Sequence, residues 1–346
     1  MRVVLAIDSF KGCLGSAEAN QAAAAGVRSV HPDAEIREIT VSDGGEGFLE
    51  AFHSAVGGAF IPVAVKDPLL RDIEAHYLLD GHTAIIEMAR ASGLTLLAPE
   101  ERNPLVATTY GTGQLVADAV RRGAERILVG LGGSATSDAG TGMLQALEDA
   151  FGPQFRESLE EVSFTLACDV DNPLCGENGA AQVYGPQKGA SGEMVAQLDA
   201  RARRFAEESA RRLGYDRSGE KGAGAAGGLG YAFLEYLDAE CRPGVALLLE
   251  TVQFDSLVAG ADLVITGEGA ADRQTLMGKL PSGILEHAGG VPVCLVAGRV
   301  SDRDRLLEAG FARVECINPP GLALEEALKK EVAQRNIAET VRRCLK

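Results

Sequence analysis

The residues best suited to chemistry lie just after short apolar runs of the sequence. Five loops there are rich in glycine or in carboxylates: 8–12, 42–47, 130–142, 168–173 and 266–269. Glycine lets backbone N–H groups approach an anion closely, and neighbouring carboxylates can hold Mg²⁺ or accept a proton. The repetition of such loops beside Asp, Glu and Lys predicts phosphate and metal chemistry.

Asp8 and Lys11 follow the first apolar run, 3–7. Phosphoryl transfer requires a cation against the phosphate oxygens and a carboxylate near the attacking hydroxyl, and this pair supplies both. Taken alone, the pair fits a helix-capping Asp and a solvated Lys at least as well. Asp43 and Glu46 bracket a double glycine, Gly44-Gly45, after the second run, although Glu46 can also simply complement a helix dipole.

Glu268 and Asp272 follow the run 262–266, and Lys279 lies beyond them. A carboxylate at the end of a strand is a reasonable general base. The five histidines lie outside all of these loops, and the G-x-S-x-G, H-R-D and D-F-G patterns are absent. Serine-hydrolase chemistry and the protein-kinase signature therefore find no support.

The loop 130–142 is the strongest candidate for an anion cradle, because it follows an apolar run and leads into a predicted helix. Gly132, Gly133, Ser134 and Asp138 are its candidate ligand-binding residues, and the Walker pattern is absent. The segment 222–230 contains a G-x-G-x-x-G match, but polar residues precede it instead of a strand. We interpret that match as tight helix packing or a mobile loop, not as a dinucleotide fingerprint.

Asp169 and Asp171 alternate on a segment that Pro173 can turn. Two nearby carboxylates suit Mg²⁺, which prefers oxygen ligands, and a pair of Asx-turns explains them equally well. Lys188 stands between turn residues in 185–189. Because the net charge is −16, lysines in glycine-rich loops become candidates for binding an anionic substrate.

The order of apolar runs predicts the fold class. The start of the chain reads strand, helix, strand, helix, and strand–helix alternation returns after residue 255, which indicates a parallel sheet. Three alternating runs between 59 and 88 predict an antiparallel meander. We therefore expect an α/β protein in which 1–60 and 255–346 form a doubly wound domain. The segment 61–254 would be an inserted mixed α/β domain.

Composition excludes several classes of protein. A net charge of −16 and a pI near 4.8 argue against nucleic-acid and anionic-membrane partners. No apolar stretch reaches the roughly 20 residues of a membrane span. Seven scattered cysteines without metal-ligand spacing fit reduced thiols in a cytoplasmic protein, expected to be a monomer or a homodimer.

Taken in series, these motifs resemble the bacterial glycerate kinase family. The resemblance rests on segments 8–14, 42–47, 130–138, 167–176, 184–190, 222–230 and 266–269, which occur in the family's order and cover essentially the whole chain. It implies MgATP-dependent phosphorylation of D-glycerate to 2-phosphoglycerate. It also implies a flavodoxin-like lobe with a second, inserted lobe.

The chain departs from the family pattern at one place. After Gly-Glu-Gly the pattern usually carries an arginine and an aliphatic residue before the aspartate, and this chain has Ala270-Ala271-Asp272. Arg273 follows, but a helix would rotate its side chain to a different place. A change in substrate preference or turnover is therefore expected.

The resemblance and the residues together lead to one mechanistic hypothesis: in-line transfer from ATP to D-glycerate in a cleft between the lobes. The expected catalytic residues are Asp8, Lys11 and Asp272; the expected substrate-binding residues are Ser9, Asp43, Gly44, Gly45, Glu46, Lys188, Glu268 and Lys279. Gly132, Gly133, Ser134 and Asp138 would bind the nucleotide, and Asp169 and Asp171 would hold Mg²⁺. The alternatives are a kinase that forms 3-phosphoglycerate, a phosphatase, or a non-catalytic sensor of a hydroxy acid or nucleotide.

Overall fold

The computed structural model describes residues 1–42 and 47–346 and divides into two compact units. Unit 1 combines Met1–Val56 with Val245–Lys346, and unit 2 is the inserted segment Gly57–Gly244. The second boundary lies about ten residues before the expected one, because helix α10 (Gly244–Thr251) packs within unit 1. Val245 approaches Gly283 so closely there that a Cβ on Gly283 would lie 2.5 Å from its Cγ1.

Unit 1 is built on a five-stranded parallel sheet. Its order is β11-β10-β9-β1-β2, with bounds β1 (Arg2–Ile7), β2 (Glu35–Glu38), β9 (Leu263–Ala271), β10 (Val293–Val300) and β11 (Arg313–Cys316). Numbered within the unit, this is the 2-1-3-4-5 order of flavodoxin-like folds. Strand order reverses between β1 and β9, and ligands of such sheets bind beyond the carboxyl ends of the strands at that switch point.

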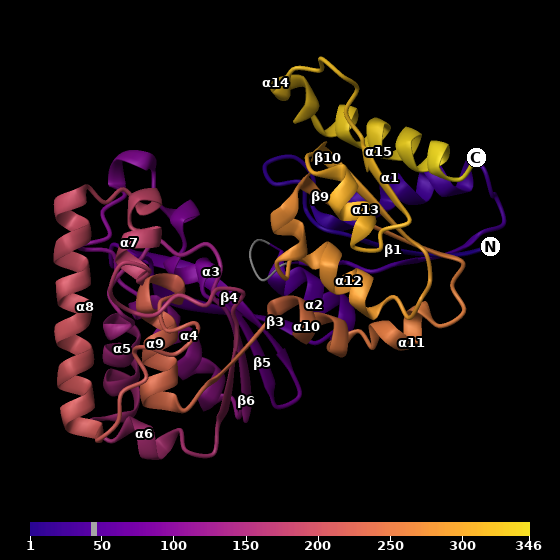
Figure 1. The fold of residues 1–346 in the computed structure, drawn as a ribbon. Helices are drawn as coiled ribbons and strands as arrows, with labels where there is room; N and C mark the ends of the chain where they lie inside the picture. Colours follow the sequence, from indigo (N-terminus) through magenta and orange to yellow (C-terminus); the bar gives the residue numbers. More distant parts are fainter. Residues whose placement is uncertain (43–46) are drawn as a thin grey trace. The chain divides into compact units, whose positions relative to one another are not determined.

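Helices cover both faces of this sheet (Figure 1). On one face α1 and α15 pack together over β1, through an alanine-rich stripe that ends at Gly26, whose missing Cβ admits the Ala338 carbonyl oxygen. The helices of unit 1 besides α10 are α1 (Ser16–Arg28), α2 (Phe48–Val56), α11 (Phe254–Val258), η4 (Arg273–Leu276), α12 (Leu280–His287), α13 (Arg303–Glu308), α14 (Leu324–Ala327) and α15 (Lys330–Cys344).

One predicted loop of unit 1 is a strand. The glycine-rich segment 266–269 belongs to β9, which continues to Ala271 because it stays in register with β10 as far as the pair Val300 and Ala271. Gly267 has no room for a side chain there, since a Cβ would lie 2.3 Å from the Val296 carbonyl oxygen. The segment therefore presents Glu268 from a rigid strand and not from a turn.

Unit 2 contains a six-stranded mixed sheet in the order β3 to β8. Its strands are β3 (Ala59–Lys66), β4 (Asp72–Asp80), β5 (Thr83–Glu87), β6 (Arg126–Gly130), β7 (Ser163–Ala167) and β8 (Glu240–Arg242). β3, β4 and β5 pair antiparallel, which confirms the predicted meander, and β5 to β8 pair parallel. The predicted α/β class, with a parallel sheet from both termini and an inserted mixed sheet, is confirmed.

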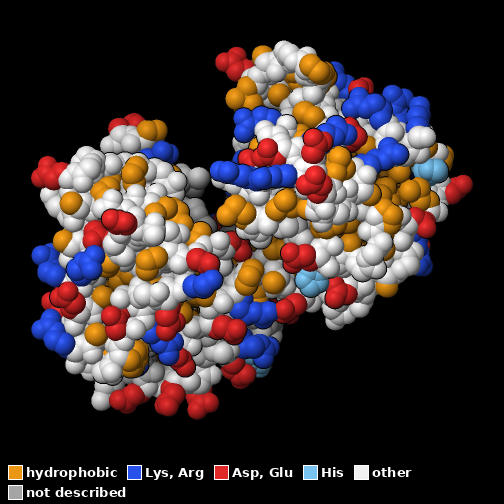
Figure 2. All heavy atoms as spheres, in the orientation of Figure 1, with side chains coloured by type: hydrophobic (Ala, Val, Ile, Leu, Met, Phe, Trp, Pro, Cys, Tyr) orange, Lys and Arg blue, Asp and Glu red, His pale blue; other side chains and the backbone are white. Residues whose placement is uncertain are grey.

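The helices of unit 2 pack around β5, β6 and β7 in one large core. They are α3 (Ala89–Ser92), η1 (Leu94–Leu96), η2 (Pro99–Glu101), α4 (Tyr110–Arg121), α5 (Thr141–Phe151), α6 (Phe155–Ser158), α7 (Ala180–Tyr184), η3 (Pro186–Lys188), α8 (Gly192–Leu213) and α9 (Ala225–Leu237). On the visible face of unit 2, acidic and basic side chains are interspersed (Figure 2). Of the helices described in either unit, none combines the length and the apolar character needed to cross a membrane.

Candidate functional site

A pocket of 430 Å³ opens in unit 1 where β1, β9 and β10 end. It contains five of the predicted site residues, namely Asp8, Ser9, Lys11, Glu268 and Lys279. Apolar side chains from 317–333 and Phe10 line the remainder, together with Arg299 and Asn318. This is the switch point at which a flavodoxin-like sheet binds its ligand, so topology and residue chemistry agree on the place.

Backbone bonds fix the groups that follow β1. The Asp8 N–H donates to the Gly267 carbonyl oxygen at 2.9 Å, and the Ser9 N–H donates to Asp8 Oδ1 at 2.7 Å. Asp8 is only 6 % exposed, whereas Lys11 is exposed at the pocket wall. The carboxylate is therefore held in a defined orientation, and an exposed lysine shares the pocket with it.

Glu268 is buried at the same pocket and has two side-chain partners. Thr275 Oγ1 donates to its Oε1 at 2.6 Å, and Lys279 Nζ donates to its Oε2 at 3.3 Å. Burial raises the pKa of the Glu268 carboxyl, while the Thr275 bond and the Lys279 charge oppose that rise. Such a group suits contact with a neutral hydroxyl, which can donate to it.

Asp272 does not line this pocket. It caps η4: its Oδ1 accepts from the Gln274 N–H at 2.7 Å, and its own N–H donates to Thr275 Oγ1 at 3.0 Å. Asp272 thus positions Thr275, which in turn holds Glu268. Sequence reasoning missed Arg299 and Asn318, although both follow apolar runs and the strand-end rule applied to Asp8 would have found them.

The glycine loop of unit 2, residues 131–140, joins β6 to α5 and leaves backbone amides available. It pairs with 92–94 through Leu94 N–H to the Gly133 carbonyl at 2.8 Å and Ala135 N–H to the Ser92 carbonyl at 2.9 Å. Within the described chain, the N–H groups of 132–134 donate to no other residue. Gly133 adopts a φ of +76°, which a side chain would oppose.

Asp138 holds this loop together from within. Its Oδ2 accepts from the Thr109 N–H at 2.8 Å, the Thr109 hydroxyl at 2.9 Å and the Gly142 N–H at 3.1 Å. Its Oδ1 accepts from the Gly140 N–H at 3.1 Å. Both oxygens are thus engaged with protein donors, and Asp138 joins the first turns of α4 and α5.

Lys188 is buried beside the same loop and is 2 % exposed. Its Nζ donates to Ser134 Oγ at 2.7 Å and to the Thr136 carbonyl oxygen at 2.6 Å. Burial lowers the pKa of this ammonium group to about 7, and the charge of Asp138 opposes the shift. Lys188, predicted to bind substrate, therefore lies in unit 2 and supports the glycine loop.

The glycines of 222–230 make room for that loop. Gly227 and Gly228 have φ values of +69° and +90°, and a Cβ on Gly227 would lie 1.9 Å from the Thr136 carbonyl oxygen. The Ala139 N–H donates to the Gly227 carbonyl oxygen at 3.0 Å. Close packing, one of the two interpretations open from the sequence, explains the motif.

Asp169 and Asp171 are both exposed in the segment after β7. Asp169 Oδ1 accepts from the Gly244 N–H at 3.1 Å, and Asp171 Oδ2 pairs with Lys221 Nζ at 2.8 Å. The part of the chain that the structure describes holds no group of three or more His, Cys, Asp or Glu arranged for a metal. Two carboxylates still suit Mg²⁺ when substrate phosphates and water complete its shell.

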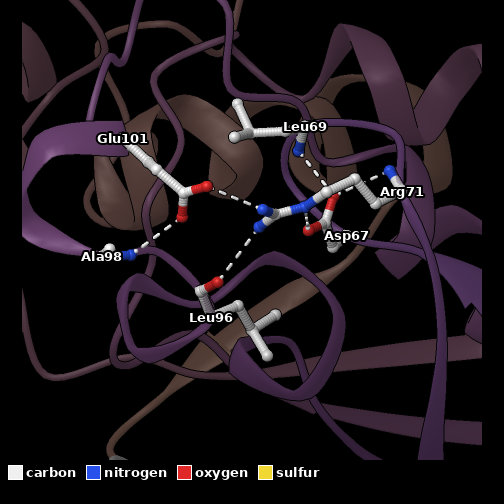
Figure 3. A network of polar contacts seen from close by, with 6 residues as sticks. All are labelled: Asp67, Leu69, Arg71, Leu96, Ala98 and Glu101. Carbon is white, nitrogen blue, oxygen red and sulfur yellow. Dashed lines mark hydrogen bonds and ion pairs between the residues drawn. The ribbon is translucent and has the colours of Figure 1, made fainter.

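An ion-pair cluster centred on Arg71 lies in unit 2 (Figure 3). Arg71 lies between Asp67 and Glu101: its Nε pairs with Asp67, its Nη1 with Glu101 Oε1 at 2.7 Å, and its Nη2 donates to the Leu96 carbonyl at 3.3 Å. Asp67 is buried and also accepts from two backbone N–H groups of its own turn. The cluster ties the β3–β4 turn to η1 and η2.

Comparison with known proteins identifies the family. The model of the glycerate kinase family matches residues 3–154 and 149–346. A glycerate kinase of Bacillus subtilis strain 168 is 41 % identical, with 99 % of this chain and 98 % of that protein aligned. A glycerate 2-kinase of Escherichia coli K12 is 38 % identical, again over 99 % of this chain and 98 % of the relative.

A solved structure supports the same family assignment. The crystal structure of a Salmonella typhimurium LT2 protein assigned as glycerate kinase 2 superimposes with a TM-score of 0.84 at 37 % identity. The superposition covers 99 % of this chain and 97 % of that one. The family model, the full-length relatives and the shared fold lead to one conclusion: this chain belongs to the glycerate kinase family.

Proposed function

We propose that the protein transfers the γ-phosphoryl group of ATP to the 2-hydroxyl of D-glycerate and forms 2-phosphoglycerate. Membership of the glycerate kinase family makes it a phosphotransferase. The observation that carries the choice of product is the full-length identity of 38 % to the Escherichia coli glycerate 2-kinase.

The pocket of unit 1 is the proposed glycerate site. Asp8 is oriented by backbone bonds and accepts the proton of the attacking hydroxyl, and Lys11 neutralises the transferring phosphoryl group. Glu268 and Lys279 orient the substrate's hydroxyl groups, and the backbone N–H of Ser9 donates to the Asp8 carboxylate. Asp272 acts through Thr275 as a positioning residue, which differs from the catalytic role expected from its place in the sequence.

The glycine loop of unit 2 is the proposed phosphate cradle for ATP. Three successive amides, of Gly132, Gly133 and Ser134, are available to phosphate oxygens, and the loop leads into α5. Lys188 and Asp138 keep these amides in place from the inner side of the loop. Replacing either side chain should weaken nucleotide binding through the loop's geometry.

Asp169 and Asp171 would hold Mg²⁺ through their hard carboxylate oxygens. When bound, the ion would neutralise negative charge on the phosphates of ATP. In the described structure the negative charge of Asp171 is compensated by the ammonium group of Lys221, 2.8 Å from its Oδ2. Substitution of Asp169 should raise the Mg²⁺ concentration required for half-maximal activity.

The decisive experiment is a product assay. Purified protein is incubated with ATP, Mg²⁺ and D-glycerate, ADP release is followed, and the phosphorylated carbon is identified by ³¹P and ¹H NMR; L-glycerate serves as the control. We expect ADP with 2-phosphoglycerate. Formation of 3-phosphoglycerate would overturn the regiochemistry and retain the kinase, and ATP binding without turnover of D-glycerate would overturn the proposed substrate.

A further inference from the structure

The pocket of unit 1 contains three basic side chains, and they differ in how the protein engages them. Lys279 already pairs with Glu268 at 3.3 Å. Arg299 is exposed, and within the described chain its guanidinium group forms no hydrogen bond or ion pair. Its charge and its planar array of donors are therefore available to a ligand in the pocket.

The pairing of β9 with β10 fixes the backbone position of Arg299 and the face of the sheet on which its side chain lies. Arg299 is the register partner of Ala270, as Ala297 is of Glu268. Side chains of paired residues on neighbouring strands share a face of the sheet, and so do residues two apart on one strand. Arg299 thus extends on the face that carries Glu268, beside a methyl group that leaves it space.

The backbone at this point is rigid. A Cβ on Gly298 would lie 2.7 Å from the Gly269 carbonyl oxygen, so the two strands approach closely just before Arg299. Asn318 Nδ2 donates to the Gly298 carbonyl oxygen at 2.8 Å, and Asn336 holds the Asn318 side chain in turn. Binding groups on strands are positioned more precisely than groups on loops.

The charged groups of the pocket indicate which functional groups its ligand should carry. A guanidinium group matches a carboxylate through two parallel N–H···O bonds, whereas an ammonium group acts as a point charge. Asp8 and Glu268 can each accept a hydrogen bond from a hydroxyl group. One carboxylate site and two hydroxyl sites in a single pocket are the complement of a small dihydroxy acid.

We propose that Arg299 binds the carboxylate of glycerate and is a specificity-determining residue of this protein. The inference rests on the proposed function and deepens it. It also gives the alanine at 270 a physical meaning. The position at which this chain lacks the arginine of the family pattern is the cross-strand neighbour of an arginine that reaches into the same pocket.

The test measures the kinetics and binding of Arg299→Ala and of the length-preserving Arg299→Gln. Both should raise KM for D-glycerate by roughly 10- to 100-fold, the effect expected for one lost charge-assisted contact, and leave KM for ATP within about threefold. D-Glycerate should stabilise the wild-type protein in a thermal-shift measurement without ATP and fail to stabilise either variant. Arg303→Ala is the matched control, because it removes one arginine of unit 1 that already pairs with Glu315 at 3.0 Å.

The outcomes separate this inference from the proposed function. If the wild-type protein does not phosphorylate D-glycerate, the proposed function fails, and this inference fails with it. If wild-type turnover is normal and the variants keep their KM for glycerate, only the role of Arg299 is wrong. A rise in KM for ATP alone would assign Arg299 to the nucleotide and would equally overturn the proposal.

Discussion

The two candidate sites of this chain differ in the groups that they expose: one exposes charged side chains and the other exposes backbone amides. In the pocket of unit 1, charged side chains at strand ends line the cavity, and Lys11 and Arg299 are exposed. In the glycine loop of unit 2, Lys188 and Asp138 bond to the protein itself, and the backbone N–H groups of 132–134 donate to no other described residue. Under the proposed function, the site in unit 1 would recognise its ligand with side chains and the loop in unit 2 would do so with its backbone.

Lysines in similar sequence contexts accordingly have different environments in the two units. Lys11 and Lys188 both stand beside glycines in polar loops. Lys11 is exposed in a pocket, whereas Lys188 is 2 % exposed and stabilises a turn. Substitutions in unit 1 should therefore act on kinetics with little effect on stability, and substitutions around the glycine loop should affect stability and nucleotide binding together.

The largest expected effect is that of Lys11→Ala. Loss of one charge that stabilises the transferring phosphoryl group lowers rates on the order of 10²–10³-fold, and we expect kcat to fall by that factor with an unchanged unfolding midpoint. Steady-state kinetics and thermal unfolding measure the two quantities. Lys329→Ala, also an exposed lysine of unit 1, is the control; a kcat near the wild-type value would remove Lys11 from the catalytic residues.

Gly227→Ala tests the backbone side of the comparison. The new Cβ would lie 1.9 Å from the Thr136 carbonyl oxygen, so the glycine loop must shift. We expect a loss of about 1–3 kcal/mol in stability, with weaker ATP binding in calorimetry. Gly123→Ala is the matched control, because Gly123 also has a positive φ, +87°, but has open space at its Cβ. Equal effects of the two substitutions would show that the contact with the loop is unimportant.

Glu268→Gln and Asp272→Asn compare a pocket group with a helix cap. We expect Glu268→Gln to lower kcat/KM by about 10- to 100-fold through its contact with substrate, and Asp272→Asn, which can still cap η4, to have a small effect. The reverse ranking would return the role of general base to Asp272.

The raised pKa of Glu268 also predicts the direction in which this carboxyl group makes the protein's folding stability change with pH. Because its folded pKa lies above its unfolded value, the folded chain binds the extra proton between those two pH values. Stability from this group is present below the unfolded pKa and is lost as pH rises through the folded pKa. The free energy of unfolding can be measured by chemical denaturation of the wild type and of Glu268→Gln from pH 4 to 7. We expect the wild-type value to fall relative to that of the variant as pH rises. A difference that stays constant with pH would contradict the desolvation of this carboxyl group.

The last comparison concerns the pH dependence that Lys188 imposes on folding. Its pKa falls from 10.5 to about 7 on folding, so between those values the unfolded chain holds a proton that the folded chain lacks. Folding should therefore become more favourable as pH rises through this window in the wild type, but not in Lys188→Met. Urea unfolding midpoints at pH 6 to 9 measure the difference, and parallel curves would show that Lys188 is not desolvated.

Local pattern predicted much of this molecule. The apolar runs gave the strand and helix order, and Asp80-Gly81 correctly marked a hairpin within the meander. Asp8, Lys11 and Glu268 could be expected to lie together because carboxyl ends of parallel strands converge whatever the loop sequence, and all three line one pocket. Residues 43–46 lie outside the described part of the chain, so their assignment to substrate binding stays a prediction.

What could not be predicted depended on contacts between distant segments. Whether a lysine is exposed like Lys11 or buried like Lys188 depends on which elements cover it. Asp272 lies outside the pocket lining and caps the 3₁₀ helix that follows it. Arg299 became a pocket residue only through the register of β9 with β10.

The division has a physical reason. Hydrophobic periodicity and glycine-rich turns are local properties, so the amino-acid order alone sufficed for the α/β class, the strand-end loops and the resemblance to the glycerate kinase family. Burial, strand register and hydrogen-bond partners join residues far apart in the chain, such as Glu268 with Ala297 and Lys188 with Ser134. Those relations, which decide what each charged group can do, exist only in the folded protein.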